Sequence, residues 1–168
     1  MNYVGLDPST KTGIVILDKA GNVILEKEIT TTIKAEPDRF MDIANQVLKH
    51  IKKDDKVCIE GFSYGSRGRG VSTQYGIGWI IRALLVKENI NYTEVTPGQL
   101  KKFATGKGNT SKDNMILPIY KKWGYEHDSD NVRDAYVLAQ IGRALEGLEN
   151  TTKYQKEVLK KLASERMS

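Results

Sequence analysis

The sequence has few of the residues that mark several common classes of protein. Its one cysteine, Cys58, cannot form an internal disulfide, and it lies in the apolar run 57–59, where a buried thiol is expected. The two histidines, His50 and His127, are isolated, so there is no Cys/His set for zinc. No apolar run approaches the roughly 18 residues that a membrane span needs, and the N-terminus lacks the pattern of a signal peptide. These absences predict a cytoplasmic protein without a membrane partner.

The residues that are present indicate one globular domain with a basic surface. A length of 168 residues suffices for one buried core, and no linker or internal repeat divides the chain. The net charge of +5 permits binding to nucleic acid but does not establish it. The basic residues gather in two glycine-rich stretches, which favours contact with phosphate groups. These residues are Arg67 and Arg69 in the first stretch, and Lys101, Lys102, Lys107 and Lys112 around the second.

The pattern of apolar residues predicts an α/β fold. Segments 2–6, 12–17 and 23–30 are β-prone, and a turn at 19–22 favours an antiparallel meander. The other expected elements are a helix at 37–51, a strand at 56–59, a helix at 72–87, a strand at 91–95, a helix from Pro97, a helix at 111–123 with Pro118 as a kink or early stop, a helix at 130–148, and a peripheral or frayed helix from 151.

This order, βββαβαβαα with a final helix, predicts one mixed five-stranded sheet with helices on both faces. The first three strands are expected to be antiparallel. We assign residues 1–150 to the main domain and residues 151–168 to a charged C-terminal tail helix.

The expected helix at 72–87 has a broad apolar face. Its members are Ile77, Gly78, Ile81, Leu84 and Leu85, with Trp79 and Ile80 outside it. This is more apolar surface than one contact with a sheet requires. Either the whole face belongs to the core, or part of it pairs two copies of the chain in a homodimer.

Three acidic sites combine into one candidate centre. Asp7 and Glu60 each end an expected strand, and Asp134 lies one turn into the helix at 130–148, with Asp130 and Asn131 on the same face. Each acid alone has an ordinary explanation, such as capping a turn or a helix. Together they offer oxygen ligands to a hard divalent cation, and Mg²⁺ is the expected choice. Two such ions would clamp the attacking and leaving oxygens of an in-line phosphoryl displacement.

These motifs, in this order, resemble those of the RuvC-type Holliday junction resolvases. Segment 5–13 (GLDPSTKTG) is similar to the first motif of that family, segment 58–60 (CIE) to the second, and segment 131–139 (NVRDAYVLA) to the last. Segment 95–112 is similar to the lysine-bearing segment between them. The resemblance extends over residues 1–148. It implies a ribonuclease H-like fold, a homodimer, Mg²⁺ or Mn²⁺, and symmetric nicking of a four-way DNA junction.

The resemblance also implies roles for individual residues. Asp7, Glu60 and Asp134 would be metal ligands, and Lys101 and Lys112 would lie near the scissile phosphate. The two basic, glycine-rich stretches, rather than the resemblance, predict that Arg67, Arg69, Lys102 and Lys107 contact DNA. Members of the family often have an acidic residue or a histidine where this chain has Asn131. We favour the adjacent Asp130 as the remaining catalytic ligand because it brings charge, although Asn131 could ligate through its carbonyl oxygen. The loop at 64–70 is unlike that of the cellular enzymes, which indicates a bacteriophage-type member.

Three other functions are compatible with parts of this pattern. A ribonuclease H-like nuclease that cuts flaps, forks or structured RNA would use the same residues. The sugar kinase, actin and Hsp70 superfamily has a similar strand, Asp and Gly/Thr turn, but it needs two such domains. A DNA-binding protein without catalysis would have no reason to keep repelling carboxylates together. The expectation is therefore an endonuclease for branched DNA.

Overall fold

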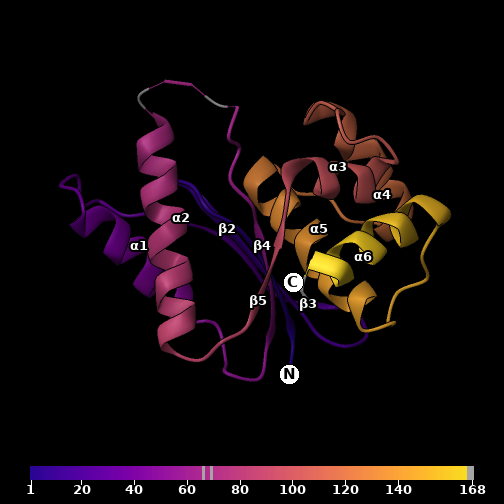
Figure 1. Ribbon diagram of the computed structural model, residues 1–168, viewed down its shortest axis with the longest axis horizontal. Helices are drawn as coiled ribbons and strands as arrows, with labels where there is room; N and C mark the ends of the chain where they lie inside the picture. The colour runs from indigo at the N-terminus through magenta and orange to yellow at the C-terminus, as the bar shows by residue number, and fades with distance from the viewer. Residues whose placement is uncertain (66, 69, 166–168) are drawn as a thin grey trace.

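A computed structural model describes residues 1–65, 67–68 and 70–165, which form one sheet between two layers of helices (Figure 1). In chain order the elements are β1 (Tyr3–Asp7), β2 (Thr12–Leu17), β3 (Val23–Ile29), α1 (Asp38–Leu48), β4 (Lys56–Glu60), α2 (Gly70–Lys87), β5 (Tyr92–Val95), α3 (Pro97–Thr105), the 3-10 turn η1 (Asp113–Met115), α4 (Ile116–Trp123), α5 (Asp130–Leu145) and α6 (Lys153–Glu165).

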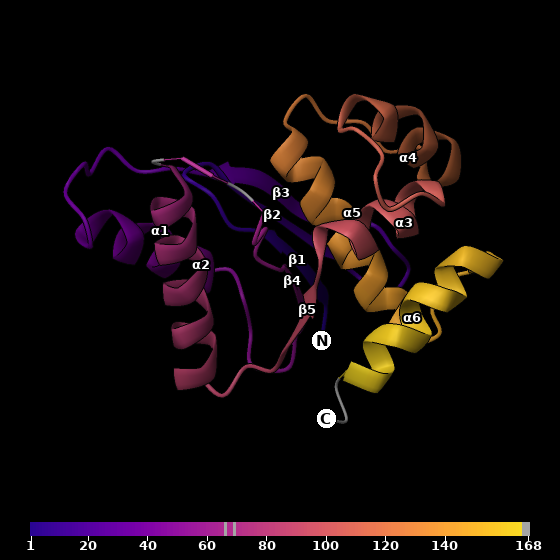
Figure 2. The same cartoon turned by 45° about the horizontal axis from the view of Figure 1, so that its top comes forward.

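The strands lie in the order β3-β2-β1-β4-β5. β1 pairs antiparallel with β2 and parallel with β4, while β2 pairs antiparallel with β3 and β4 pairs parallel with β5. Helices α1 and α2 cover one face, and α3 to α6 lie on the other side (Figures 1 and 2). The predicted mixed five-stranded sheet, with its first three strands antiparallel, is confirmed.

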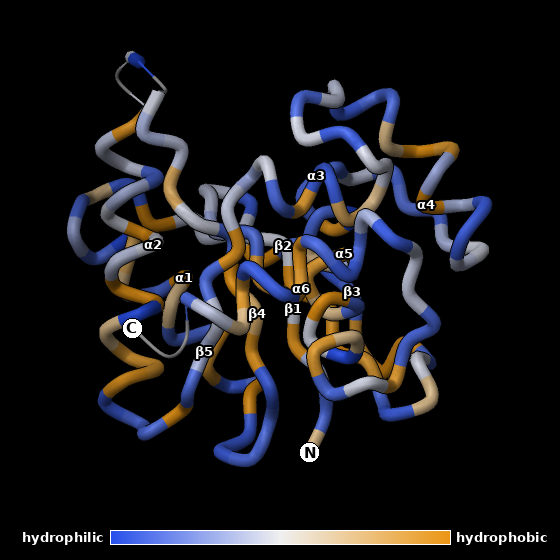
Figure 3. Tube along the Cα trace, turned by 45° about the vertical axis from the view of Figure 1, so that its right-hand side comes forward, coloured by the Kyte–Doolittle hydropathy of each residue, from blue (hydrophilic) through white to orange (hydrophobic). Residues whose placement is uncertain are grey.

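Alternate residues of each strand enter two different cores, because successive side chains of a strand point to opposite faces. Tyr3 of β1 and Cys58 of β4 pack with α5, as expected for a buried thiol. Val4 and Val57, their neighbours in sequence, pack with α1 and α2. Figure 3 shows the hydrophobic strands at the centre and hydrophilic connections around them. The two cores therefore determine the side of the sheet to which the last side chain of each strand points.

The apolar face predicted for α2 is core, so its use as a dimer contact is wrong. Ile77, Gly78, Ile81 and Leu85 are buried, and Leu84 packs partly against the same cluster. The side chains that α2 exposes include Trp79 and Val86. An apolar helix face can pack either on the sheet of its own chain or on a second copy of the chain, and the sequence leaves both options open. In the structure this face packs on the sheet.

The second half of the chain differs from the predicted elements in two ways. The helix expected at 111–123 is divided into η1 and α4, and Pro118 lies in the first turn of α4, where its missing N–H costs nothing. Four α-helices follow β5, one for each segment expected after the strand at 91–95, although the order βββαβαβαα with a final helix contains only three. The helix α6 is packed against α3 through a buried face that includes Val158 and Leu162. None of the described helices is both long and apolar enough to cross a membrane.

The helix α5 lies directly against the backbones of β1 and β2. A Cβ atom on Gly5 would lie 1.8 Å from the carbonyl oxygen of Ala135, and one on Gly13 would lie 2.1 Å from that of Asn131. Real Cβ atoms do not approach backbone so closely, so only glycine allows this packing. The close approach brings the first turns of α5 to the ends of β1 and β4.

We expect Gly5→Ala to lower the free energy of unfolding by about 2 kcal/mol or more, because the methyl group must push α5 away from β1. The matched control is Gly142→Ala on α5, whose Cβ would have ordinary contacts, the nearest at 3.5 Å. That change should be neutral or stabilising, because alanine favours the helix. Urea unfolding of both variants measures the difference. Equal stabilities would mean that the close approach is not required.

Candidate metal centre

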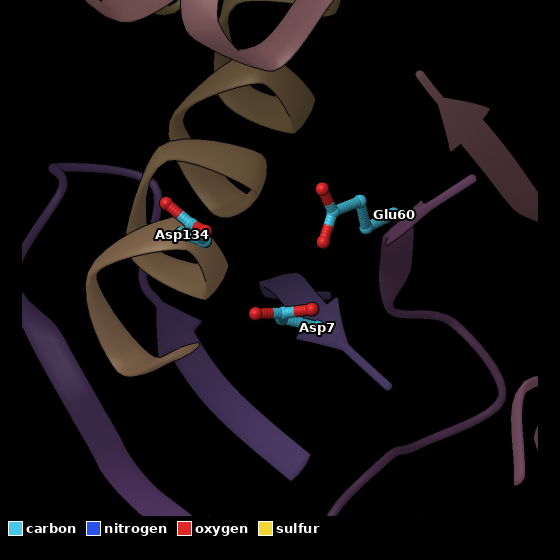
Figure 4. A group of neighbouring side chains, drawn as sticks. All are labelled: Asp7, Glu60 and Asp134. Atoms are coloured by element: carbon cyan, nitrogen blue, oxygen red, sulfur yellow. The ribbon is translucent and has the colours of Figure 1, made fainter. Parts of the chain in front are cut away.

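Two strand ends place Asp7 and Glu60 side by side. β1 and β4 are parallel neighbours, so their carboxyl ends meet at the same edge of the sheet. Asp7 shares a face with Tyr3, and Glu60 shares a face with Cys58, because each pair is separated by an even number of residues. Both side chains therefore point to the face that α5 covers (Figure 4).

Asp134 completes the cluster from α5. Ser129 caps this helix by accepting a hydrogen bond from the backbone N–H of Val132, and the close packing on β1 turns Asp134 toward the strand ends. One carboxylate oxygen from each of Asp7, Glu60 and Asp134 lies within 4.8 Å of the others. Within residues 1–65, 67–68 and 70–165, this is the one group of three acidic, histidine or cysteine side chains with such spacing.

Burial and mutual repulsion favour protons on these carboxylates in the absence of a cation. Burial, and then the charge of Glu60, raise the pKa of Asp7 well above its ordinary value. Burial also raises the pKa of Glu60, although part of its side chain is exposed. The pKa of Asp134 is raised to about 7 by burial and by the charge of Asp7. An oxygen-only donor set with more negative charge than its surroundings compensate fits a hard divalent cation.

Lys112 is the cation in direct contact with this cluster among the described residues. Its Nζ lies 2.5 Å from a carboxylate oxygen of Asp130 and 3.7 Å from one of Asp134. Burial lowers the pKa of Lys112, but the hydrogen bond to Asp130 and the charges of Asp134 and Asp7 outweigh this effect and raise it. The same hydrogen bond lowers the pKa of Asp130, whose side chain is 41% exposed. Asp130 thus lies beside the three-carboxylate group and tethers Lys112 there.

Asn131 contacts the turn after β1. Its side-chain amide donates a hydrogen bond to the backbone carbonyl of Lys11. This bond ties the first turn of α5 to the polar turn that follows Asp7. The adjacent residues 130 and 131 therefore have different partners, and Asp130 is the one that touches the cationic side of the centre.

The other predicted basic residues have different surroundings. Burial raises the pKa of Glu60, and the charge of Lys101 on α3 offsets a small part of this rise, so Lys101 lies near the centre. Its neighbour Lys102 instead forms an ion pair of 2.9 Å with Glu157 of α6. Lys107 is exposed on the loop after α3, and Arg67 is exposed on the loop between β4 and α2. Arg69 lies outside the described residues.

Two features beside Glu60 were not indicated by the motifs. Phe62 packs edge-on against Tyr64 and Tyr75 and at a tilt against Trp79, forming an aromatic cluster directly after the strand end. Arg82 of α2 is buried against the same segment. A lone arginine inside the apolar pattern of residues 72–87 is the sequence signal that could have indicated it.

Comparison with known proteins agrees with this arrangement. No protein-family model matches the chain. The crossover junction endodeoxyribonuclease RuvC of Campylobacter hominis is 30% identical over 150 residues, which cover 83% of this chain and 93% of that protein. RuvC of Petrotoga mobilis is 30% identical over 151 residues, covering 83% and 91%.

Solved structures match as well. The structure of Thermus thermophilus RuvC has a TM-score of 0.69 at 15% identity, covering 90% of this chain and all of that one. The same protein in complex with a Holliday junction substrate has a TM-score of 0.65, covering 90% and 99%.

The mixed sheet, its two helical layers and the acidic edge define a ribonuclease H-like protein with a centre suited to a divalent metal ion. The extent of the sequence similarity goes further. The chain belongs to the RuvC family of crossover junction endodeoxyribonucleases.

We expect the metal-free protein to lose stability as the pH rises. The unfolded chain ionises Asp134 near pH 3.8, whereas the folded protein keeps it protonated up to about pH 7. Between these values the folded state binds more protons, so the free energy of unfolding falls as the pH rises through this window. One pKa unit corresponds to about 1.4 kcal/mol, so the loss is on the order of 2–4 kcal/mol.

Asp134→Asn should remove much of this loss, which urea unfolding in EDTA at pH 5 and pH 8 can measure. The exposed Asp128→Asn is the matched control and should leave the pH dependence unchanged. A wild-type protein that is equally stable at both pH values would contradict the assignment of a raised pKa to Asp134.

Proposed function

We propose that this protein is a metal-dependent endonuclease that nicks branched DNA such as Holliday junctions. The observation that carries the proposal is the convergence of Asp7, Glu60 and Asp134 at one edge of the sheet. Membership of the RuvC family supports it. A neighbour of the same fold has been solved in complex with a Holliday junction substrate, which supports branched DNA as the partner.

Asp7, Glu60 and Asp134 would hold Mg²⁺, and Mn²⁺ would substitute for it. Bound there, divalent ions would activate water and stabilise the attacking and leaving oxygens of the phosphodiester. The backbones of two strand ends and one helix orient the carboxylates, and a metal ion held by them would restrict where the scissile phosphate can lie. We favour Asp130 over Asn131 as the fourth ligand, because its carboxylate already lies beside the cluster and brings charge.

The lysines would act on the phosphate. Lys112 can stabilise charge that builds on the phosphoryl oxygens, and Lys101 lies near Glu60 on the α3 side. Lys107 and Arg67, exposed on two loops, would bind the DNA backbone, as would Lys102 once it leaves Glu157. Arg69 stays a predicted DNA contact on the basis of the sequence alone. An origin in a bacteriophage stays a prediction that depends on the loop at 64–70.

The proposal is tested by incubating the protein with matched four-way, three-way, flap and linear duplex DNA, with and without Mg²⁺. We expect nicking of the four-way junction, dependent on the metal. Asp7→Asn should abolish nicking while folding and junction binding persist, because the change relieves repulsion among buried carboxylates. Equal cutting of flaps and four-way junctions would indicate a nuclease without junction specificity. Full activity of Asp7→Asn would remove Asp7 from the site.

Lys112→Ala is expected to lower the cleavage rate roughly 100-fold and to change affinity little, because the lysine meets charge that develops in the transition state. Lys107→Ala is the comparison. Its side chain is exposed on the loop, so its loss should weaken binding in a salt-dependent way. Single-turnover nicking at saturating enzyme gives the rate, and binding in Ca²⁺ gives the affinity. Wild-type nicking by saturated Lys112→Ala would limit its role to binding.

We further propose a homodimer, because two active sites are needed to cut two strands symmetrically. The outward face of α2 supports this proposal. Trp79 and Val86 are 58% and 65% exposed, Ala83 is exposed between them, and no charged side chain interrupts this face before Lys87. An exposed apolar stripe of this length is typical of a surface that contacts another protein.

Ala83→Glu should give monomers at micromolar concentration, because it places a charge in the middle of this stripe. Sedimentation velocity measures the state of association. Ile24→Glu is the control, since Ile24 is also an exposed apolar residue but lies on β3. A wild-type protein that sediments only as a monomer, or an Ala83→Glu variant that stays dimeric, would contradict this interface.

A further inference from the structure

Arg82 is a buried charge in a helix that has no other charged residue before Lys87. It is 2% exposed and lies among the apolar side chains with which α2 covers the sheet. This face of the sheet is opposite to the one that carries the metal centre. Burying a guanidinium group costs free energy unless its N–H groups are paired, so the contacts of Arg82 indicate its role.

The guanidinium group joins three segments of the chain. Its Nε donates to Oε2 of Glu94 on β5 at 3.0 Å, and its Nη2 lies 2.9 Å from the same oxygen. Nη2 also donates to the backbone carbonyl of Glu60 at 2.9 Å, and Nη1 donates to that of Gly78 at 3.0 Å. The group therefore links α2, the last residue of β4 and the edge strand β5.

The segment that follows Glu60 is held by the same side chain. The carbon atom of the guanidinium group lies 4.3 Å from the centre of the Phe62 ring, a cation–π contact. Gly78 makes room for this arrangement, because a Cβ there would lie 2.7 Å from the Phe62 ring. Arg82 thus contacts the chain at residue 60 and again at residue 62, on both sides of Gly61, whose N–H donates to the backbone carbonyl of Val95 on β5.

Stability alone does not account for an arginine at this position. Glu94 is 42% exposed and can be solvated without a partner. An apolar side chain of similar length would fill the same core without the desolvation cost, and such replacements of buried ion pairs are often neutral or stabilising. What an apolar side chain cannot do is donate to the carbonyl of Glu60. The planar, multidentate geometry of arginine suits that task.

We propose that Arg82 is a positioning residue for Glu60. It holds the main chain of Glu60 from the α2 side, so that the carboxylate on the opposite side stays in register with Asp7 and Asp134. This inference depends on the proposed function, because it assumes that Glu60 ligates a metal ion. Partners that orient a metal ligand without touching the metal typically change affinity or activity by about 10–100-fold when removed.

The test compares Arg82→Met, which keeps length and loses the donors, with Leu85→Ala, which opens a cavity in the same core one turn along α2. Mn²⁺ binding to the DNA-free protein is measured by electron paramagnetic resonance. Single-turnover nicking of a four-way junction and junction binding in Ca²⁺ are measured in parallel. Arg82→Met should bind Mn²⁺ and cleave about tenfold more weakly, with unchanged affinity for the junction. Leu85→Ala should lose stability while its Mn²⁺ affinity stays that of the wild type.

Arg82→Lys separates geometry from charge, because lysine keeps the charge but not the planar fork, so it should also bind Mn²⁺ more weakly than the wild type. If Arg82→Met does not fold, the same measurements on Arg82→Lys decide the question. Wild-type Mn²⁺ affinity in the folded Arg82 variants, or an equal loss in Leu85→Ala, would overturn the proposal. A wild-type protein that neither binds Mn²⁺ nor nicks the junction would instead refute the proposed function.

Discussion

The contact of α5 with the bare backbones of β1 and β2 is the constraint on which the acidic centre depends. Gly5 and Gly13 let the helix lie so close that any side chain there would displace it. The apolar residues of α5 fill the core on that face and supply the driving force for the contact. Asp134 is carried to the strand ends by this packing, although its charge opposes those of Asp7 and Glu60.

The resulting cluster has more negative charge than the protein itself compensates. Lys112 is the cation that touches it within the described part of the chain, and it shares its ammonium group between Asp130 and Asp134. Burial, and after it the charge of the neighbouring carboxylates, raises the pKa values of Asp7 and Asp134. Binding of a positively charged group to such a centre is favourable, and oxygen ligands bind hard cations in preference to softer ones. The stored repulsion is therefore also the basis of the affinity proposed for a metal ion.

Those parts of the fold and the site that depend on local periodicity could be predicted from the sequence. The mixed sheet follows from the order of strands and helices, and the positions of Asp7 and Glu60 follow from strand ends. Contacts between elements that are distant in the chain could not be predicted. The ion pair of Lys102 with Glu157 and the hydrogen bond of Arg82 to the carbonyl of Glu60 both depend on tertiary packing, which periodicity does not specify.

The three proposed ligands are held by three different kinds of restraint. Asp7 ends β1, which is paired with a strand on both sides, and Asp134 is fixed by the packing of α5. Glu60 ends β4, and its own backbone carbonyl accepts a hydrogen bond from Arg82. Because all three backbones are already in place, binding a cation needs little rearrangement of the main chain. On the proposed function, it would need the loss of the protons that burial favours. Lys112, which lies between Asp130 and Asp134, would then face a phosphate held at the same centre, so the proposed lysine and the proposed metal ligands act on one position.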